Sequence, residues 1–248
     1  MILSDKSAFI TGGARGIGQT LAHGFVQAGA KVTLADIDIA AAQAAAAKFP
    51  AGTAIAVACD VTDRNSIAAA MARTVGAFGG LHILVNNAAR HQYEFNQPCT
   101  QLAPDKWRTI LDVNIMGTVN CSTLAAEQMR KYGGGAILNL SSVAGYEVNT
   151  SYGVTKLAIR GLTMAMAEEL APDNIRVNGI APGFMDSETV LKDVPAFIAE
   201  KFINEFQLIK RQGRMTELIG AARLLCSDEG SFITGETIMI GGGAGRHV

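Results

Sequence analysis

The chain has 248 residues, 49% of them hydrophobic and 17% charged, and its formal net charge is −1. This length allows one large domain or two small ones, and the near-neutral charge gives no electrostatic basis for binding nucleic acid or an anionic membrane. The first residues show no basic segment followed by an apolar run, and no uncharged apolar stretch could span a bilayer. We therefore expect a cytoplasmic protein without a nucleic-acid or membrane partner.

The cysteines are far apart and form no Cys-x-x-Cys pair, which argues against a disulfide framework or a zinc site. They are Cys59, Cys99, Cys121 and Cys226. We interpret them as small apolar residues in a reducing compartment, and we expect no metal.

The first predicted element is a strand at residues 7–11, followed by a glycine-rich turn and a helix that runs to about residue 28. The turn contains Gly12, Gly16 and Gly18, with Arg15 and Ile17 between them. Glycines let the backbone turn tightly and approach a pyrophosphate, and a helix N-terminus offers free N–H groups and partial positive charge. Glycines alone are a weak signal, but the strand and helix on either side indicate a dinucleotide site.

A second predicted strand, residues 31–35, ends at Asp36, which follows Gly18 by 18 positions. A carboxylate about 20 residues after the glycines is expected to bond the adenosine ribose hydroxyls. Asp36 and Asp38 would repel a 2′-phosphate, whereas Arg15 could attract one. Because Asp36 would contact the ribose directly, we expect NAD rather than NADP.

Strands and helices then alternate, with a helix at 39–48, a strand at 53–58, a helix at 67–78 capped by Asp63, and a strand at 81–85. This order predicts an α/β fold, a doubly wound parallel sheet of the Rossmann type with helices on both faces. Ligands bind such sheets at the carboxyl ends of the strands, where the glycine loop, Asp36, Asp60 and Asn87 fall. The irregular residues 90–100 would form one pocket wall. There, a lone His91 is more often a surface or lining residue than a catalytic one.

A long helix is predicted over residues 104–131, with Pro104 in its first turn. Asn114 and Gly117 lie inside it, where both residue types are locally unfavourable. The glycine is either a tolerated packing residue, or the pair marks a kink whose freed carbonyl holds a water.

The next predicted strand, 136–140, leads to Ser141 and Ser142, and a helix then carries Tyr152 and Lys156 on one side to about residue 170. A tyrosine has an ordinary pKa of about 10, and a nearby cation favours its phenolate and lowers that pKa. Ser142 could hold a substrate oxygen beside the phenol. A Tyr-x-x-x-Lys pair also arises by chance on solvated helices, so its interpretation depends on the other motifs.

The remaining predicted elements are a strand at 175–180, an irregular insert at 184–214, a helix at 217–226 and a strand at 237–240. Phe197, Phe202 and Phe206 in the insert are spaced like one helix face, which fits either a substrate lid or a helix packed on the core. No linker or internal repeat is evident, so we expect one domain over residues 1–248, with 184–214 as its substrate-binding insert.

Taken together, the chain resembles the short-chain dehydrogenase/reductase family in its compact single-domain branch. The motifs that carry the resemblance occur in the family's order along the whole chain: Thr11-Gly12-x-x-x-Gly16-Ile17-Gly18, Asp60-Val61, Asn86-Asn87-Ala88-Ala89, Asn114, Ser142, Tyr152-x-x-x-Lys156, Pro182-Gly183 and Ile233-Thr234-Gly235.

The resemblance implies a catalytic role for four residues. Tyr152 would donate and accept the proton at the substrate oxygen, and Lys156 would lower its pKa and bond the nicotinamide ribose. Ser142 would orient the substrate, and Asn114 would hold a water that links Lys156 to solvent.

It also implies further cofactor contacts. Asp60 and Val61 would flank the adenine, and Asn87 would lie near the adenosine ribose and the nicotinamide side. Pro182, Gly183, Met185 and Ser187 would lie at the carboxamide end and the phosphates. The family commonly forms homotetramers through the helices of Asn114 and Tyr152.

The chain departs from the family at three places. Ala89 replaces a usual glycine, and Gly241 replaces a usual aspartate. The interval from Ser142 to Tyr152 is about three residues shorter than in most relatives, so its loop must take a tighter path. That path could reshape the pocket, or leave Ser141 or neither serine in place.

The sequence therefore predicts an NAD-dependent oxidoreductase that interconverts a secondary alcohol, or a polyol or sugar alcohol, and its ketone. The alternative is a catalytically silent dinucleotide-binding regulatory or scaffold protein of the same fold, which the shortened loop would permit. A lyase on this scaffold is less favoured, because the glycine loop and Asp36 are intact.

Overall fold

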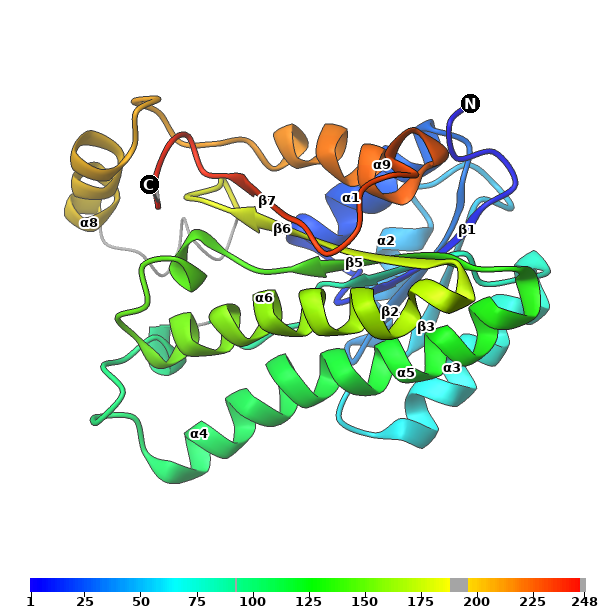
Figure 1. Ribbon diagram of the computed structural model, residues 1–248, viewed down its shortest axis with the longest axis horizontal. Coiled ribbons are helices and arrows are strands. Elements are labelled where there is room, and N and C mark those ends of the chain that lie inside the picture. The colour runs from blue at the N-terminus through cyan, green and yellow to red at the C-terminus, as the bar shows by residue number, and fades with distance from the viewer. Residues whose placement is uncertain (92, 188–195, 246–248) are drawn as a thin grey trace.

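The computed structural model describes residues 1–91, 93–187 and 196–245. At its centre is a parallel sheet of seven strands in the order β3-β2-β1-β4-β5-β6-β7 (Figure 1). The strands are β1 (Ser7–Thr11), β2 (Lys31–Asp36), β3 (Ala54–Ala58), β4 (Ile83–Asn86), β5 (Gly135–Leu140), β6 (Ile175–Pro182) and β7 (Thr237–Ile240). The predicted doubly wound parallel sheet is confirmed, and its strand order reverses between β1 and β4.

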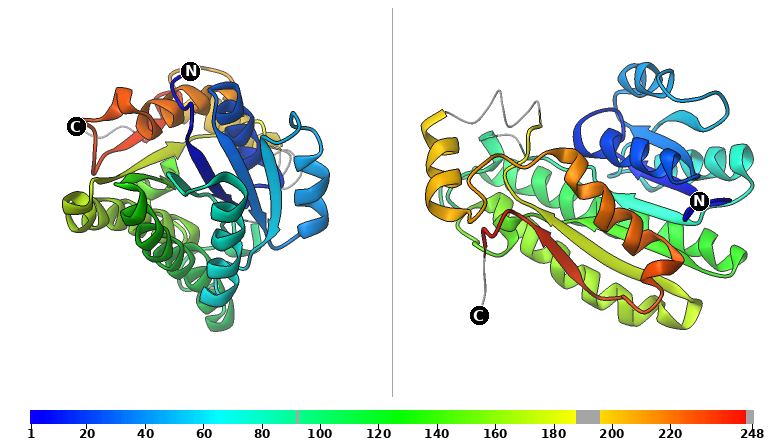
Figure 2. Two further views of the ribbon diagram at one scale, coloured as in Figure 1. Left: turned by 90° about the vertical axis from the view of Figure 1, so that its right-hand side faces the viewer. Right: turned by 90° about the horizontal axis from the view of Figure 1, so that it is seen from above.

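Helices cover both faces of the sheet, as the two turned views show (Figure 2). The helices α1 (Gly16–Gln27), α2 (Ile39–Ala46) and α9 (Ile219–Cys226) contribute to one apolar cluster with the strands. The helices α3 (Arg64–Phe78), α5 (Gly117–Met129) and α6 (Ser151–Leu170) form the cluster on the opposite face. Long strands buried on both faces explain why the strand residues are almost continuously apolar.

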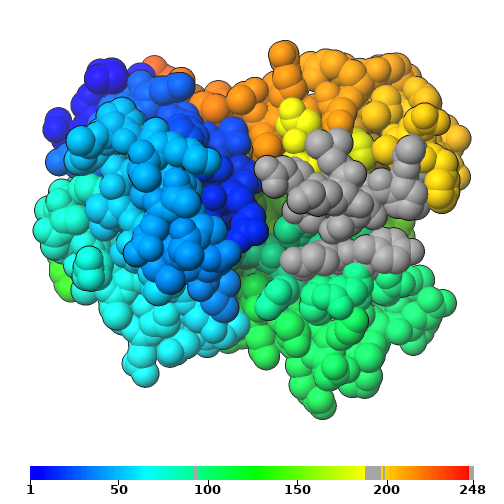
Figure 3. All heavy atoms as spheres, turned by 180° about the vertical axis from the view of Figure 1, so that it is seen from behind, coloured from blue at the N-terminus to red at the C-terminus, as the bar shows by residue number. Residues whose placement is uncertain are grey.

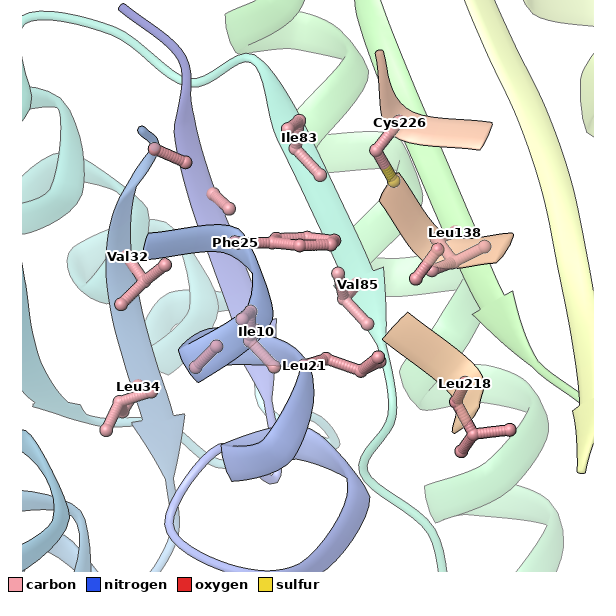
Figure 4. Packing of buried hydrophobic residues seen from close by; sticks show 14 of the residues in the cluster. Ile10, Leu21, Phe25, Val32, Leu34, Ile83, Val85, Leu138, Leu218 and Cys226 are labelled. Atoms are coloured by element: carbon pink, nitrogen blue, oxygen red, sulfur yellow. The ribbon is translucent and has the colours of Figure 1, made fainter. Parts of the chain in front are cut away.

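The first of these clusters holds the amino-terminal half of the sheet against the carboxyl-terminal helices. Leu21 and Phe25 of α1 are fully buried and lie over β1 and β4, with Leu218 and Cys226 beyond them (Figure 4). This packing fixes the glycine-rich turn before α1 relative to the sheet. Three of the four cysteines are buried as expected, whereas Cys99 is exposed.

The predicted helix over residues 104–131 is divided into two. It runs as α4 (Pro104–Leu111), a wide π-helical turn over Asp112–Met116, and α5. Gly117, the first residue of α5, lets Val61 pack closely, because a Cβ there would lie 2.7 Å from Cγ2 of Val61. The helix is therefore locally irregular at Asn114, as one alternative expected, and Gly117 is a packing glycine, as the other expected. The water on the carbonyl stays a prediction.

The described part of the predicted insert contains α8 (Ala196–Lys201) and a π-helical turn over Phe202–Phe206, and α8 lies beyond the carboxyl ends of the strands (Figure 1). The ring of Phe202 lies 5.7 Å from that of Phe184 and 5.9 Å from that of Phe206. Phe197 is exposed, so the three phenylalanines do not share one buried face. Residues 188–195 of this segment lie outside the described residues.

The surface is hollowed on the face shown in Figure 3, where the blue amino-terminal part of the chain meets its green central part. Within the described ranges, no helix is long and apolar enough to cross a membrane. Those same residues contain no group of three or more His, Cys, Asp or Glu side chains placed to hold a metal ion.

Candidate active site

The glycine-rich turn lies at the point where the strand order reverses, the usual ligand site of an open parallel sheet. Gly12 and Gly16 have φ angles of 61° and 57°, in the left-handed region that favours glycine. A Cβ at Gly18 would lie 2.4 Å from the carbonyl oxygen of Gly12, whereas a Cβ at Gly16 would meet nothing within 4 Å. The turn is thus closed on the protein side and open on the outer side, where a pyrophosphate would fit.

Asn87 ties this turn to the end of β4. Its Nδ2 donates to the carbonyl oxygens of Thr11 and Gly12, at 2.9 Å each. The hydroxyl of Thr11 in turn accepts from the backbone N–H groups of Asn87 and Ala88, at 3.0 Å each. Asn87 therefore stabilises the conformation of the glycine turn. The sequence analysis expected only a cofactor contact from this residue. Ile17, at the start of α1, packs against the apolar core.

The end of β2 carries a carboxylate that is already held in place. Asp36 accepts hydrogen bonds from the backbone N–H groups of Ala14 and Asp38, both at 3.1 Å. Arg15 donates to Asp38 at 2.6 Å, in a pair whose side chains are 66% and 46% exposed. Arg15, which we expected to attract a 2′-phosphate, is therefore paired with Asp38. The sequence analysis did not predict this ion pair.

At the end of β3, Asp60 accepts from the backbone N–H and the hydroxyl of Thr62, at 2.9 and 2.7 Å. Val61 is buried and packs against the start of α5, where the missing Cβ of Gly117 makes room for it. Both residues lie at the carboxyl edge of the sheet, as the strand assignment predicted.

Ser142, Tyr152 and Lys156 come together at the end of β5 and the start of α6. Thr150 caps α6 by accepting from the backbone N–H of Gly153, which begins the helix at Ser151 and places the tyrosine in its first turn. Ser142 lies near Tyr152, close enough to lower the pKa of the phenol. The Nζ of Lys156 lies 5.5 Å from the centroid of the Tyr152 ring. The shortened loop has therefore not pulled Ser142 away from the tyrosine.

The neighbouring Ser141 points elsewhere. It is buried, and its hydroxyl donates to the carbonyl oxygen of Lys156 at 2.8 Å. The hydroxyl of Ser142 instead accepts from the backbone N–H of Ala144 at 3.2 Å. Of the two serines that the sequence left open, Ser142 is the one beside the phenol.

The electrostatics of this group differ from the simple expectation that Lys156 makes Tyr152 acidic. Burial raises the pKa of Tyr152 to about 12, and the hydrogen bond with Ser142 lowers it. Burial also lowers the pKa of Lys156 to about 8. The ammonium is 2.6 Å from the carbonyl oxygen of Leu140, to which it donates, so its charge is partly satisfied by the strand end. Burial is therefore the largest influence on both groups.

Asn114 is buried in the π-helical turn, next to this group. Its Nδ2 donates to the hydroxyl of Thr155 at 3.0 Å and to the carbonyl oxygen of Arg90 at 3.1 Å, and its Oδ1 accepts from the backbone N–H of Arg90 at 2.7 Å. The hydroxyl of Thr118 donates to the backbone carbonyl of Asn114 at 2.9 Å. Asn114 thus connects the loop after β4 to α6, and the carbonyl that we expected to hold a water already has one protein donor.

The end of β6 packs closely on the end of β7. The backbone N–H of Gly183 donates to the carbonyl oxygen of Ile240 at 3.0 Å, and a Cβ at Gly183 would lie 2.6 Å from the Cα of Gly241. A Cβ at Gly241 would in turn lie 2.6 Å from Cγ1 of Val143. The departure from the usual aspartate at Gly241 therefore has a local cause, since Val143 fills that space.

Three further predicted cofactor residues lie at or after the end of β6. Pro182 is the last residue of β6, Met185 is buried and bridges to Gly213, and Ser187 is half-buried. A cavity of about 140 Å³ lies beside Met185, between Phe184, Gln207, Ile209 and Ile240. His91, which we did not assign a catalytic role, is exposed, with Nδ1 3.4 Å from the carbonyl oxygen of Ala89.

These features define a dinucleotide-binding α/β protein with a Ser-Tyr-Lys group at the edge where the cofactor would lie. Residues 12–245 match the family model described as enoyl-(acyl carrier protein) reductase. An uncharacterized oxidoreductase of Mycobacterium tuberculosis (strain ATCC 25618 / H37Rv) is 38% identical, and a sorbitol dehydrogenase of Cereibacter sphaeroides is 35% identical, each over 98% of both chains.

A solved structure of 7α-hydroxysteroid dehydrogenase, complexed with NADH and 7-oxo glycochenodeoxycholic acid, matches with a TM-score of 0.91 at 33% identity. The match covers 98% of this chain and 95% of that one. The chain therefore belongs to the short-chain dehydrogenase/reductase family and is an oxidoreductase of that type.

Proposed function

We propose that this protein is an NAD-dependent dehydrogenase that interconverts a secondary alcohol and its ketone. The observation that carries the proposal is that Tyr152 has the ammonium of Lys156 5.5 Å from its ring centroid and Ser142 near enough to lower its pKa. The shortened loop was the reason for considering a catalytically silent scaffold, and the nearness of Ser142 to Tyr152 supports an active enzyme instead. Relatives that are dehydrogenases of a polyol and of a hydroxysteroid support the same reaction class.

The residues of the glycine turn fit a dinucleotide. Gly12 and Gly16 adopt left-handed backbone angles, and the first turn of α1 has no side-chain cap hydrogen bond from Arg15, so its N–H groups can bind a pyrophosphate. When bound, the nicotinamide ring would accept or return a hydride. Asp36 would bond the ribose hydroxyls, and the pairing of Arg15 with Asp38 favours NAD over NADP.

The chain's own residues would move the proton. With a pKa of about 12, Tyr152 is protonated near neutrality and can donate its proton to a ketone oxygen. In the direction of oxidation, Tyr152 must first lose that proton, which the ammonium of Lys156 and the positive charge of the oxidised cofactor both favour. Ser142 would orient the substrate oxygen against the phenol. Oxidation should therefore become faster as pH rises.

Asn114 would support Lys156 through its position in the π-helical turn, and we retain the proposal that a water there links the lysine to solvent. Asp60 and Val61 would flank the adenine, and Asn87, Pro182, Gly183, Met185 and Ser187 would line the nicotinamide side. The whole chain would act as one domain, with residues 184–214 as the substrate-binding insert.

We also propose a homotetramer. Met116 precedes α5, and Leu157 and Met164 lie on α6; all three are large apolar side chains that are exposed in the single chain. The two helices run side by side along the outside of the fold (Figure 1). Light scattering on the purified protein would give the mass directly, and a monomer would contradict the proposal.

The test of function is reduction of NAD, followed at 340 nm, with a panel of secondary alcohols, polyols, hydroxysteroids and hydroxyacyl thioesters. The proposal predicts turnover with at least one class and a preference for NAD over NADP. NADH binding without turnover of any alcohol or ketone across the panel would instead favour the silent scaffold.

A further inference from the structure

The short turn between β5 and α6 is clamped from the side of α6 by Arg160. The guanidinium of Arg160 lies over the ring of Tyr146, 3.6 Å from its centroid. Its Nη1 also donates to the carbonyl oxygen of Gly145 at 2.9 Å. One side chain thus makes two different contacts with consecutive residues of the turn. A planar guanidinium can stack and donate at the same time, which a lysine ammonium cannot do.

The same turn is fastened on its other side by β7 and the residues that follow it. The hydroxyl of Tyr146 donates to the carbonyl oxygen of Thr237 at 3.2 Å. The carboxylate of Glu147 accepts from the backbone N–H of Gly245 at 3.1 Å. Tyr146 is therefore held between α6 and β7, and Glu147 ties the turn to the end of the described chain.

The clamped residues lie directly against the proposed catalytic group. A Cβ at Gly145 would lie 2.7 Å from the backbone carbonyl carbon of Lys156, so this part of the turn rests on α6 at the lysine. Ser142 begins the turn, and its hydroxyl accepts from the backbone N–H of Ala144. Only the short helical turn Val143–Gly145 separates Ser142 from Tyr146. A shift of the backbone at Tyr146 would therefore also move Ser142.

We propose that Arg160 is a positioning residue that, by clamping Gly145 and Tyr146, holds the hydroxyl of Ser142 on the phenol of Tyr152. This inference rests on the proposed function, because it assigns Arg160 a role in that reaction. In the described part of the chain, Arg160 contacts Gly145 and Tyr146, so it would act on Ser142 and Tyr152 through the turn. A cation–π interaction is stronger where the pair is partly removed from water, and Arg160 and Tyr146 are both half-buried.

The kinetic test compares Arg160→Met, Tyr146→Leu and the double variant with the parent protein, using an alcohol found in the panel. Displacing a catalytic group by a fraction of an ångström to an ångström costs roughly ten- to hundredfold in rate, so each single variant should lose at least about tenfold in kcat. The double variant should lose less than the product of the two single losses, because both changes break the stacking contact that Arg160 and Tyr146 share. Arg160→Lys should recover only part of the rate.

Two further readouts separate positioning from general structural damage. The Kd for NADH should stay within about twofold, because the glycine turn is fastened by Asn87 and not by Arg160. The pH dependence of oxidation should shift upward, because a weakened bond from Ser142 leaves the pKa of Tyr152 higher. The matched control is Arg130→Met, which removes an arginine paired with Asp173 at the surface and should keep the parent rate.

Hydrogen exchange tests the clamp without turnover. Amides of residues 143–150 should exchange faster in Arg160→Met, while those of β1 should not change. If the parent protein oxidises no alcohol, the proposed function fails, and the exchange result still shows whether the clamp exists. Three results would each overturn the inference. They are unchanged hydrogen exchange in Arg160→Met, losses in kcat that multiply in the double variant, and an Arg160→Met variant whose kcat stays within twofold of the parent with an unshifted pH profile.

Discussion

Neutralising the two aspartates at the end of β2 should change which nicotinamide cofactor the protein binds. Two unit charges 4 Å apart in a site near the surface interact by about 1 to 4 kcal/mol, depending on the effective dielectric. Removing the carboxylate of Asp36 should therefore tighten NADPH binding by roughly five- to 700-fold, since 1.4 kcal/mol corresponds to a factor of ten. NADH should bind more weakly, because the ribose hydroxyls lose their acceptor.

Asp38→Asn should act by releasing Arg15 from its ion pair. Both side chains of that pair are substantially exposed, so breaking it should cost the fold no more than about 1 kcal/mol. The freed guanidinium could then meet a 2′-phosphate with charge-assisted hydrogen bonds. We expect the double variant Asp36→Ala, Asp38→Asn to bind NADPH more tightly than either single variant.

Fluorescence titration of the parent and variant proteins with NADH and NADPH measures both Kd values without any alcohol substrate. Asp105→Asn, at an exposed position in the first turn of α4, is the control for a general change in charge. A ratio of the two Kd values that stays within twofold of the parent in the double variant would refute the assignment of Asp36 and Asp38.

Three predictions concern the fold. Gly18→Ala should destabilise the protein by about 1 to 3 kcal/mol and weaken NADH binding, because its Cβ would meet the carbonyl oxygen of Gly12 at 2.4 Å. Gly76→Ala, where a Cβ meets nothing within 4 Å inside α3, should instead stabilise it by about 0.5 to 1 kcal/mol in urea unfolding. The Nδ1 of His82 accepts from the backbone N–H of Ser7 at 3.1 Å, and burial lowers the pKa of His82 below its ordinary value of 6.5. The neutral imidazole therefore stabilises the fold above pH 6.5, and this stability should be lost as the pH falls through the lowered pKa. Urea unfolding between pH 5 and 7, compared with His82→Asn, would show a shallower loss in the variant; equal slopes would contradict this.

Local spacing was enough to predict most of the framework. The strand-turn-helix around Gly12 and Gly16, the cap at Asp63 and the alternating apolar segments each depend on neighbouring residues, and all three are confirmed. The pair of Tyr152 and Lys156 was visible because four residues make about one helical turn.

What the sequence did not show depends on the directions of side chains from distant segments. Arg15 and Asp38 were both noted, yet nothing in their spacing said that they pair with each other. The carbonyl of Leu140 takes the ammonium of Lys156, and this contact exists only once β5 and α6 are packed together.

The pKa of Tyr152 was also not predictable from its neighbours in the sequence. Spacing indicated a nearby cation, which lowers the pKa, but the larger effect is burial, which raises it to about 12. Arg160 follows Lys156 by four positions on the same helix, so a search for cations along α6 could have found it, although its contact with Tyr146 depends on the path of the short turn.

The most direct test of the proposed chemistry is the rate of NAD reduction by the Tyr152→Phe variant, measured at 340 nm alongside its Kd for NADH. The substitution keeps the ring and removes only the hydroxyl that would carry the proton, and general acid–base catalysis contributes about 10²- to 10⁴-fold. We predict that kcat falls by at least about 10²-fold while the Kd for NADH stays within about threefold. A variant that binds NADH normally and retains a kcat within tenfold of the parent would contradict the assignment of Tyr152 as the proton donor and acceptor.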